Sequence, residues 1–543
     1  MVICQKYFDD YEARNLFAIM REYSLLGWGS FMEFIYRFYG KFDNSRNFYV
    51  LIIAITCVHF SIRGLLYPAE ASDGAEQLYF SQVFLLGYDI VNPPLYTWIM
   101  VVFHKLFGVT NVSVSLIKFL AYGLSFHFLY VLACNSIRDK RLCMLASLSP
   151  LWLYYMAWDA VLSYTHTVLA TMFILACFTS LVRLRDEGNI RTYAIFGVVL
   201  GFGFVSKYTF AIAAIALLVS SLICAPYRAI ILRPLMLVSL VIAVLIIAPH
   251  GYWLLNNVSE INSAVGNKFE VNAVNEFLFA NQLLGLKSVI TSIIGFISPL
   301  WLILLLVFWR PIRNRTTRAA ALSPSTKLIL TYIFLIIALL LAFVLVFGVT
   351  KVRAHYMFIL IPLPVAFFAW LEPSLKKSRS PQVYAFTLIT VAVLLVGGMT
   401  LKYLTEPTFC NRCQLLLPYK DIAQKIRASG FRGGTIFTTY FPHDLAGNFR
   451  STFPNTRIVS TKFPSITRPL GSNYGQCLVI WMPAPMGNID TGFMTHLTNK
   501  YFGSNIPVSN FPVKKIDFHF DRAPTRVGLL HYMMFDPGVG ECR

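Results

Sequence analysis

Long apolar segments fill the chain between residues 47 and 401, and few polar residues interrupt them. Many of the segments approach the roughly 20 residues that a helix needs to cross a bilayer. The segments lie at 47–66, 94–108, 112–134, 141–157, 161–182, 192–206, 208–224, 230–249, 287–308, 326–349, 354–371 and 382–401. This pattern predicts a polytopic α-helical membrane protein.

Composition supports this prediction, because only 13% of the residues are charged, whereas soluble domains average about 25%. So few charges cannot cover the water-exposed surface that a chain of 543 residues would have. A soluble enzyme, a disordered chain and a disulfide-stapled miniprotein are therefore excluded.

The two ends of the chain differ from this middle part. Residues 1–46 are mixed and basic. Beyond residue 401, short apolar or alternating runs such as 434–440 and 477–482 are separated by Pro, Gly and Asn, as in soluble domains. We therefore expect an N-terminal segment (1–46), a transmembrane domain (47–401) and a C-terminal α/β domain (402–543).

Short basic loops hold much of the net charge of +20 and orient the chain. Such loops usually face the cytoplasm. All of them can do so together only if segment 94–108 does not cross the membrane. That segment follows Pro93 and contains His104 and Lys105, which suits a helix lying in the membrane interface. The basic residues that define these loops are Arg138, Lys140, Arg141, Arg183, Arg185, Arg191, Arg228, Arg233, Arg310, Arg313, Arg315, Arg318, Lys327, Lys376, Lys377 and Arg379.

This assignment leaves about eleven transmembrane helices plus one interfacial helix. It predicts a cytoplasmic N-terminus and extracytoplasmic loops at 67–111 and 250–286, with the C-terminal domain on the same side as those loops. Because membrane topology accounts for the basic excess, a nucleic-acid partner is not expected.

Four cysteines of the C-terminal domain are candidates for disulfides, because an extracytoplasmic compartment is oxidising. The CxxC pair could instead bind zinc or act in redox chemistry, but no second CxxC or paired His follows it. The sequence leaves all three connectivities open. The four residues are Cys410, Cys413, Cys477 and Cys542.

Three acidic residues stand near the predicted outer surface. Asp73 and Glu76 are spaced to share one face of a helix, and Asp159 occupies a short turn between two apolar segments. A carboxylate there can act as a general base toward a hydroxyl group. Alternatively, the pair solubilises an interfacial helix, and Asp159 caps the helix that follows it.

Several cations on the same side run against the positive-inside trend, and an anionic ligand such as a lipid phosphate would explain them. Lys207 precedes Tyr208 where two apolar runs meet, and Arg353, His355 and Tyr356 cluster at another outer turn. The alternative is that the lysine snorkels to lipid headgroups.

One histidine, His250, opens the large outer loop, where a structural role competes with ligand binding.

The order of these motifs resembles the GT-C membrane glycosyltransferases, in particular the protein O-mannosyltransferases, the lipid A aminoarabinose transferases and the lipid A–core galacturonosyltransferases. Five motifs follow one another in that family: an acidic motif after the first span, a Pro-Pro-Leu-aromatic-x-Trp helix, an outer Asp, a Lys-Tyr pair and a later Tyr–Pro segment. They are matched here by Asp73-Gly74, Pro93 to Trp98, Asp159, Lys207-Tyr208 and His355-Tyr356 through Pro364.

The resemblance implies sugar transfer from a polyprenyl-phosphate donor to an envelope acceptor at the outer face of the inner membrane. Lipid A or lipopolysaccharide core is the first acceptor, and a protein hydroxyl is the second. It implies catalytic roles for Asp73, Asp159 and Glu76. No cofactor is obligatory, and a metal requirement stays open.

The family often has Lys before Pro-Pro, where it holds the donor phosphate, but this chain has Asn92. Phosphate binding then falls to other residues near the outer surface. The candidates are Lys105, Lys207, Tyr208, Arg353, His355 and Tyr356, with His250 and Trp98 toward the acceptor or the outer loop.

The sequence leaves two other classes of function as alternatives. A lipid or glycan transporter would use Asp159 and Lys207 as charges along a pathway. It is disfavoured because the chain shows no pseudo-repeated halves. An interaction scaffold would leave the outer acidic residues unexplained.

Overall fold

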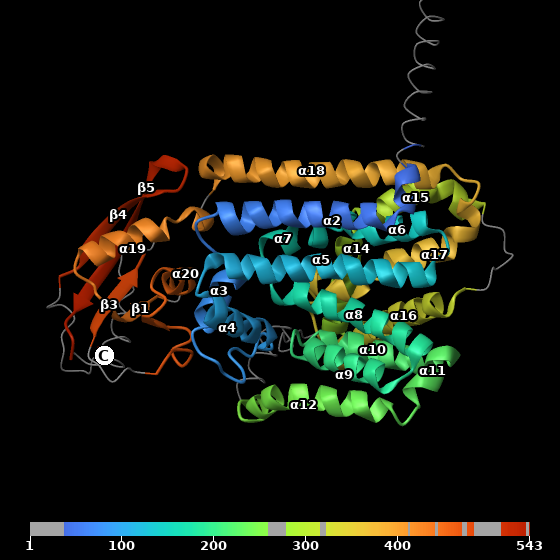
Figure 1. Ribbon diagram of the computed structural model, residues 1–543, viewed down its shortest axis with the longest axis horizontal. Helices are drawn as coiled ribbons and strands as arrows, with labels where there is room; N and C mark the ends of the chain where they lie inside the picture. Colours follow the sequence, from blue (N-terminus) through green and yellow to red (C-terminus); the bar gives the residue numbers. More distant parts are fainter. Residues whose placement is uncertain are drawn as a thin grey trace, which may run out of the picture.

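The computed structural model describes residues 37, 39–258, 279–314, 322–410, 413–439, 444–469, 475–482, 512–538 and 542. Within them, a helical bundle joins a smaller domain that contains a β-sheet (Figure 1). The long helices run the length of the bundle, and the sheet domain, hereafter the tail domain, packs against one end of it.

The bundle is built from helices that follow the predicted apolar segments closely. Their bounds are α2 (Ser45–Phe60), α3 (Asp73–Phe80), α4 (Leu95–Phe107), α5 (Asn111–Ser136), α6 (Lys140–Leu148), α7 (Ala160–Leu162), α8 (His166–Glu187), α9 (Ile190–Phe204), α10 (Phe210–Ile223), α11 (Ala225–Ile231), α12 (Met236–Leu255), α14 (Ala280–Ile297), α15 (Leu300–Arg313), α16 (Pro324–Phe347), α17 (Leu363–Leu375) and α18 (Ser380–Phe409).

Seven stretches of the described chain are long and apolar enough to cross a membrane, and up to nine if two bent helix pairs each count as one span. The expected eleven is higher for identifiable reasons. Segment 192–206 forms the 15-residue helix α9, which is shorter than a full span. Segment 141–157 is divided, because α6 ends at Leu148 and a short turn containing Pro150 follows. The difference between nine and seven comes from the two bent pairs, which are α10 with α11 and the short helix Ala354–Leu360 with α17.

The segment assigned to the interface forms α4, which lies beside α3 at the tail-domain end of the bundle (Figure 1). The predicted basic loops lie at the opposite end, where α8 meets α9 and α17 meets α18. This separation agrees with the predicted topology; which end faces the cytoplasm stays a prediction. We call these the basic end and the tail-domain end.

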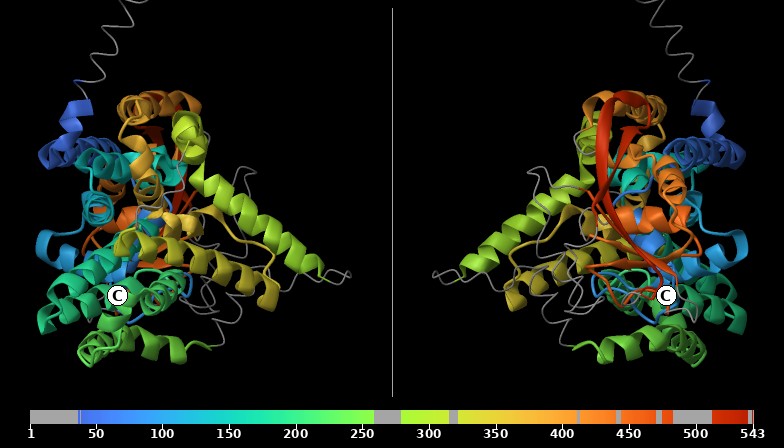
Figure 2. Two further views of the ribbon diagram at one scale, coloured as in Figure 1. Left: turned by 90° about the vertical axis from the view of Figure 1, so that its right-hand side faces the viewer. Right: turned by 90° about the vertical axis from the view of Figure 1, so that its left-hand side faces the viewer.

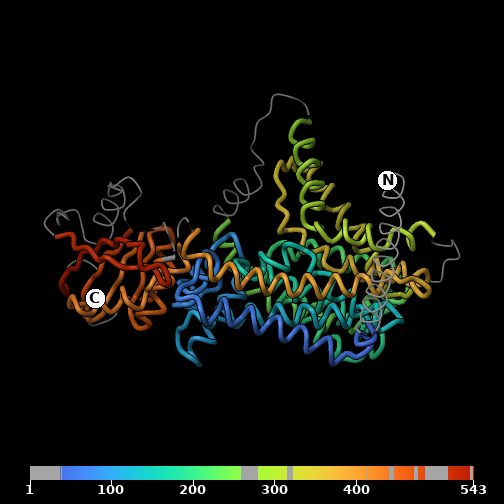
Figure 3. The backbone as a smooth tube through the Cα atoms, turned by 90° about the horizontal axis from the view of Figure 1, so that it is seen from above, coloured from blue at the N-terminus to red at the C-terminus, as the bar shows by residue number. Residues whose placement is uncertain are grey.

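On one side, α14 and the adjoining part of α16 stand away from the main bundle (Figures 2 and 3). Many large apolar side chains are exposed on the bundle, including Leu245, Phe334 and Val393. An apolar surface of this extent requires a non-aqueous surrounding, as a bilayer provides.

The tail domain is an α/β domain, as predicted. Its five strands have the order β2-β1-β3-β5-β4, with parallel pairs around β1 and antiparallel pairs to β5. Its elements are α19 (Tyr419–Ala428), β1 (Gly434–Thr438), α20 (Asp444–Thr452), β2 (Arg457–Ser460), β3 (Gln476–Trp481), β4 (Lys514–Phe520) and β5 (Ala523–Phe535).

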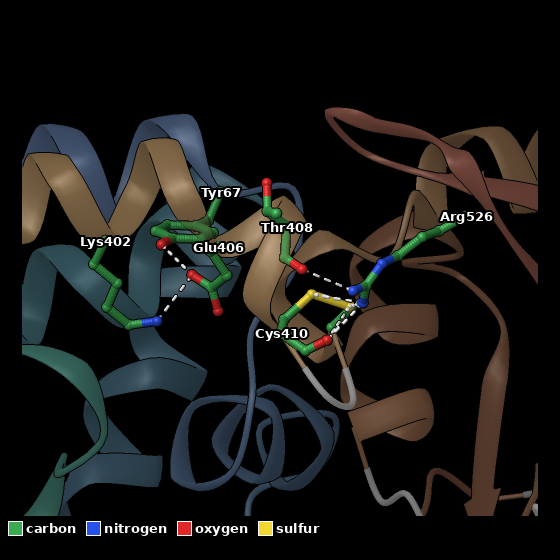
Figure 4. The surroundings of a disulfide bond; sticks show 7 residues. Tyr67, Lys402, Glu406, Thr408, Cys410 and Arg526 are labelled. Carbon is green, nitrogen blue, oxygen red and sulfur yellow. Dashed lines mark hydrogen bonds and ion pairs between the residues drawn. A yellow bond between two sulfur atoms is a disulfide. The ribbon is translucent and has the colours of Figure 1, made fainter.

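Two disulfides connect the tail cysteines, Cys410 to Cys413 and Cys477 to Cys542, which resolves the open connectivity. The first one follows the end of α18 (Figure 4). Arg526 of β5 donates hydrogen bonds there to the carbonyl oxygens of Thr408 (2.9 Å) and Cys410 (2.5 Å). The long helix is thereby fixed to the sheet.

The tail domain also contacts the bundle through α20, which packs closely on α3 (Figure 1). Gly447 permits this approach, because a Cβ atom there would lie 1.9 Å from the carbonyl oxygen of Ala75. Asn448 bonds both the backbone N–H (2.9 Å) and the carbonyl oxygen (2.8 Å) of Glu70. The segment that carries the candidate acids is therefore held between the two domains.

Candidate active site

The acidic pair lies in the first turn of α3, which begins at Asp73. The helix starts abruptly, because Ser72 adopts a positive φ of 49°. Just before it, Glu70 forms a buried ion pair with Arg63 at 2.7 Å. A Cβ atom on Gly74 would lie 2.5 Å from the Glu70 carboxylate, so glycine at this position leaves room for the ion pair. This contact explains why a glycine follows Asp73.

Glu76 is half-buried, and its pKa is raised to about 8. Burial is the main cause, followed by the negative charges of Asp73 and Asp89, while Lys462 of the tail domain acts in the opposite direction. A carboxyl group with this pKa is largely protonated at neutral pH. Glu76 therefore suits hydrogen-bond donation better than proton abstraction, and Asp73 is the better candidate for a base.

A buried hydrogen-bond network fixes the orientation of α3. Gln77 accepts from the Thr97 hydroxyl at 2.5 Å and pairs with His166 at 3.0 Å. These contacts join α3 to α4 and to the first residue of α8. A rigid helix is what a catalytic carboxylate needs, because small displacements of the base are costly in rate.

Tyr164 interacts with several of the predicted acids and cations. Burial raises its pKa to about 12, with further contributions from Asp159 and Asp73 and an opposing one from Arg353. Its ring stacks on His355 with centroids 5.2 Å apart. The charges of two acids and one arginine, together with the ring of His355, thus act on one phenol group from three separate stretches of the chain.

Asp159 lies just before α7, but its side chain makes no capping hydrogen bond, so the capping alternative is not realised. Burial raises its pKa, and a hydrogen bond from Tyr154 opposes the shift. The carboxylate therefore remains available to the group around Tyr164.

Lys207 is buried and bonds the hydroxyl of Thr167 at the start of α8. Its ammonium group lies 5.8 Å from the ring centres of Tyr356 and Phe358. Lys207 and Tyr356, which belong to two separate groups in the sequence, therefore lie close together, and Tyr356 is the direct chain neighbour of His355. Together with Arg353, these residues form a cationic, aromatic-lined side of the site.

Tyr208 and His250 form a second group, joined by a hydrogen bond of 3.0 Å. His250 also contacts the carbonyl oxygen of Leu86 in the loop between α3 and α4 (3.0 Å). Asp89 of the same loop raises the pKa values of both Tyr208 and Glu76, after the effect of burial. The loop thus lies between the two groups.

Two other predicted residues have different surroundings. Trp98 donates to the carbonyl oxygen of Leu85 at 2.8 Å and stacks on Phe84, which supports the loop before α4. Lys105 is exposed in the last turn of α4, far along the helix from its start at Leu95. The structure gives no contact between Lys105 and the other candidates.

The sequence motifs do not single out Tyr164, Thr167, His166, Asp89 or Lys462. Tyr164 and His166 follow Asp159 within one turn region, so their proximity was a usable signal. Lys462 carried no such signal, because it lies almost 400 residues beyond Glu76 in the chain. Within the part of the chain that the structure describes, no three His, Cys, Asp or Glu side chains are grouped to hold a metal ion.

Comparison with known proteins places this arrangement among characterised folds. Residues 91–253 match the family model described as dolichyl-phosphate-mannose-protein mannosyltransferase. The chain is 25% identical over 440 residues to the lipopolysaccharide core galacturonosyltransferase RgtB of Rhizobium johnstonii, covering 80% of this chain and 86% of that protein. It is 25% identical over 450 residues to RgtA of the same organism, with the same coverage.

The fold is similar to a crystal structure of ArnT from Cupriavidus metallidurans bound to undecaprenyl phosphate. The TM-score is 0.53 at 14% sequence identity, over 90% of this chain and 98% of that one. The likeness therefore includes both the helical bundle and the tail domain.

Proposed function

We propose that the chain is a membrane glycosyltransferase of the GT-C class, which transfers a sugar from a polyprenyl-phosphate donor to lipid A or lipopolysaccharide core. The two relatives that align with 80% of this chain are named lipopolysaccharide core galacturonosyltransferases. The structural neighbour was crystallised with undecaprenyl phosphate. The chain is an integral membrane protein with at least seven helices that could span a bilayer among its described residues.

One observation carries the proposal: at the tail-domain end the ring of Tyr164 stacks on His355, and the charges of Asp73, Asp159 and Arg353 act on the pKa of the same phenol. A lipid-linked donor brings a phosphate and a sugar to such a site together. The cationic side, with Lys207 and Arg353, binds the phosphate, and the acidic side faces the sugar and the incoming hydroxyl.

In the reaction, an acceptor hydroxyl attacks the anomeric carbon, and Asp73 takes the hydroxyl proton. The new C–O bond forms as the bond to the phosphate oxygen breaks, and the polyprenyl phosphate leaves with the negative charge that Lys207 and Arg353 stabilise. General-base assistance of this kind is typically worth about 10²–10⁴-fold in rate. The donor already carries a good leaving group, and by family analogy the anomeric centre inverts.

We further propose that the tail-domain end faces the periplasm and the basic end the cytoplasm. The two disulfides support this orientation, because they lie in the tail domain and persist in oxidising compartments.

The test is a transfer assay with the purified full-length protein and labelled polyprenyl-phosphate galacturonic acid. Lipopolysaccharide from a deletion strain serves as the acceptor, and a protein fraction from the same strain serves as the comparison. We expect label in the lipopolysaccharide only. Label in the protein fraction alone would favour protein O-glycosylation, and label that moves across vesicles without covalent transfer would indicate a transporter.

A further inference from the structure

The segment 460–463 of the tail domain lies directly over α3. The hydroxyl of Tyr79 accepts a hydrogen bond from the backbone N–H of Ser460 (3.1 Å) and donates one to the carbonyl oxygen of Phe463 (2.8 Å). The ring of Phe463 also meets Phe80 edge-on at 5.0 Å. Tyr79 of α3 therefore binds both ends of this segment.

The two hydrogen bonds of Tyr79 hold the segment that contains Lys462 near the acidic pair of α3. Glu76 and Tyr79 are three residues apart on α3 and share one helix face. The charge of Lys462 acts on Glu76, and its ammonium group lies 4.6 Å from the ring centre of Phe463. The side chain is exposed, so it can reach a ligand without being pulled from a buried position.

The acids consequently have nearby cations that belong to two different domains. Lys207 and Arg353 come from the bundle and lie around Tyr164, Tyr356 and Phe358. Lys462 comes from the tail domain. The leaving phosphate occupies the bundle side, and in a displacement with inversion the attacking hydroxyl approaches the opposite face of the sugar. The tail side is then the acceptor side.

We propose that Lys462 binds an anionic group, a phosphate or a carboxylate, on the sugar acceptor, so that the tail domain forms part of the acceptor site. This inference rests on the proposed function and extends it to the chemistry of the acceptor. A lysine suits the role because it offers a compact charge with three donors on a flexible stem. If Lys462 only balanced the charge of the acidic pair, its removal would affect every acceptor equally.

The experiment compares Lys462→Ala and Lys462→Arg with Lys420→Ala, an exposed lysine on α19 of the same domain. Each full-length variant in nanodiscs is assayed for transfer to three acceptors: intact rough lipopolysaccharide, the same material dephosphorylated, and the same material with its carboxyl groups reduced. Equilibrium binding of each acceptor is measured in parallel, without donor.

We expect Lys462→Ala to raise the KM and the Kd for intact lipopolysaccharide about tenfold, which is typical for losing a hydrogen bond to a charged group. The kcat and the KM for the donor should stay within about twofold, a range ordinary for changes that touch no reacting group. Lys462→Arg should restore most of the affinity, and Lys420→Ala should match the wild type. The effect should vanish on one modified acceptor, which identifies the anion.

Equal KM values for Lys462→Ala and Lys420→Ala would overturn the inference, as would an undiminished effect on both modified acceptors. The binding arm separates this failure from that of the proposed function. If the wild type transfers no label but binds lipopolysaccharide through Lys462, the proposed function fails and the anion site stands. If the wild type transfers label normally and Lys462→Ala changes nothing, the proposed function stands and the anion site fails.

Discussion

Charged side chains gather at both ends of the helical bundle, but they have different partners at each end. At the basic end, most of the charged side chains are exposed; some partners are local, and others, such as Asp43 for Arg141, come from another segment. Asp139 accepts from the backbone N–H of Arg141 at 2.9 Å and caps α6, and Arg183 pairs with Glu187 one helical turn away. At the tail-domain end, charges from distant segments meet around Tyr164 and α3.

The charges at the two ends therefore have different roles: those at the basic end orient the helices in the membrane, and those at the tail-domain end belong to the candidate active site. Exposed charges with local partners orient helices and cap them, and each contributes little to stability. Charges from several segments, among them the half-buried Asp73, Glu76 and Asp159, cost free energy to bring together, and such clusters are typical of sites that perform a reaction. The predictions below test this contrast, from the largest expected effect to the smallest.

The cationic side should be indispensable for donor binding. We expect Lys207→Met to raise the KM for the polyprenyl-phosphate donor about 10- to 100-fold, because a charge-assisted hydrogen bond to the phosphate is lost. Steady-state kinetics at saturating acceptor measure this effect. An unchanged donor KM would show that the phosphate binds elsewhere.

The contact between α20 and α3 should be intolerant of added volume. Gly447→Ala places a methyl group against the Ala75 carbonyl oxygen and should lower thermal stability, since overpacking typically costs about 1–3 kcal/mol. Transfer should fall as α3 shifts. The control is Gly397→Ala in α18, where a Cβ atom meets nothing within 4 Å, and it should behave as wild type.

Glu76 should matter through its protonated form. Its pKa of about 8 lies above the unfolded value, so the folded state binds this proton more tightly. Its contribution to stability is complete below about pH 4.5 and is lost as the pH rises to about 8. We expect Glu76→Gln to flatten this decline in thermal melts between pH 5 and 9, and to keep transfer at pH 7 within about threefold of wild type. A melt profile that stays as steep would contradict the assigned pKa.

The smallest functional effect should come from the basic end. Asp139→Ala removes a helix cap and should cost about 1 kcal/mol of stability. Transfer at permissive temperature should equal that of the wild type. Loss of activity in a variant that melts normally would erase the distinction between the two ends.

Much of the fold was predictable, because it depends on local signals. Apolar segment length predicted the helices, and the loop charges together with the polar residues of 94–108 assigned that segment to a helix outside the set of spans, which is α4. Spacing placed Asp73 and Glu76 in one helical turn. The oxidising compartment predicted the disulfides, although only the structure gave their pairing.

The candidate site was only partly predictable, because its contacts join distant residues. Nothing near Lys462 in the sequence indicates that Tyr79 holds its segment over α3. Lys105 shows the opposite problem: the sequence placed a cation near the outer surface, but helix geometry carries it along α4 to an exposed last turn. The break around Pro150 likewise divides the apolar segment 141–157, which therefore does not form a continuous span.

The central claim is that Asp73 is the base for sugar transfer, and single-turnover transfer by Asp73→Asn tests it most directly. The matched control is Asp421→Asn, which neutralises an exposed carboxylate of α19 that pairs with Lys425. Both proteins should insert, fold and bind the lipid donor as the wild type does. We predict that Asp73→Asn slows transfer by about 10²–10⁴-fold while the control is unaffected. A single-turnover rate for Asp73→Asn within about twofold of wild type, well inside the loss expected for a base, would contradict the account.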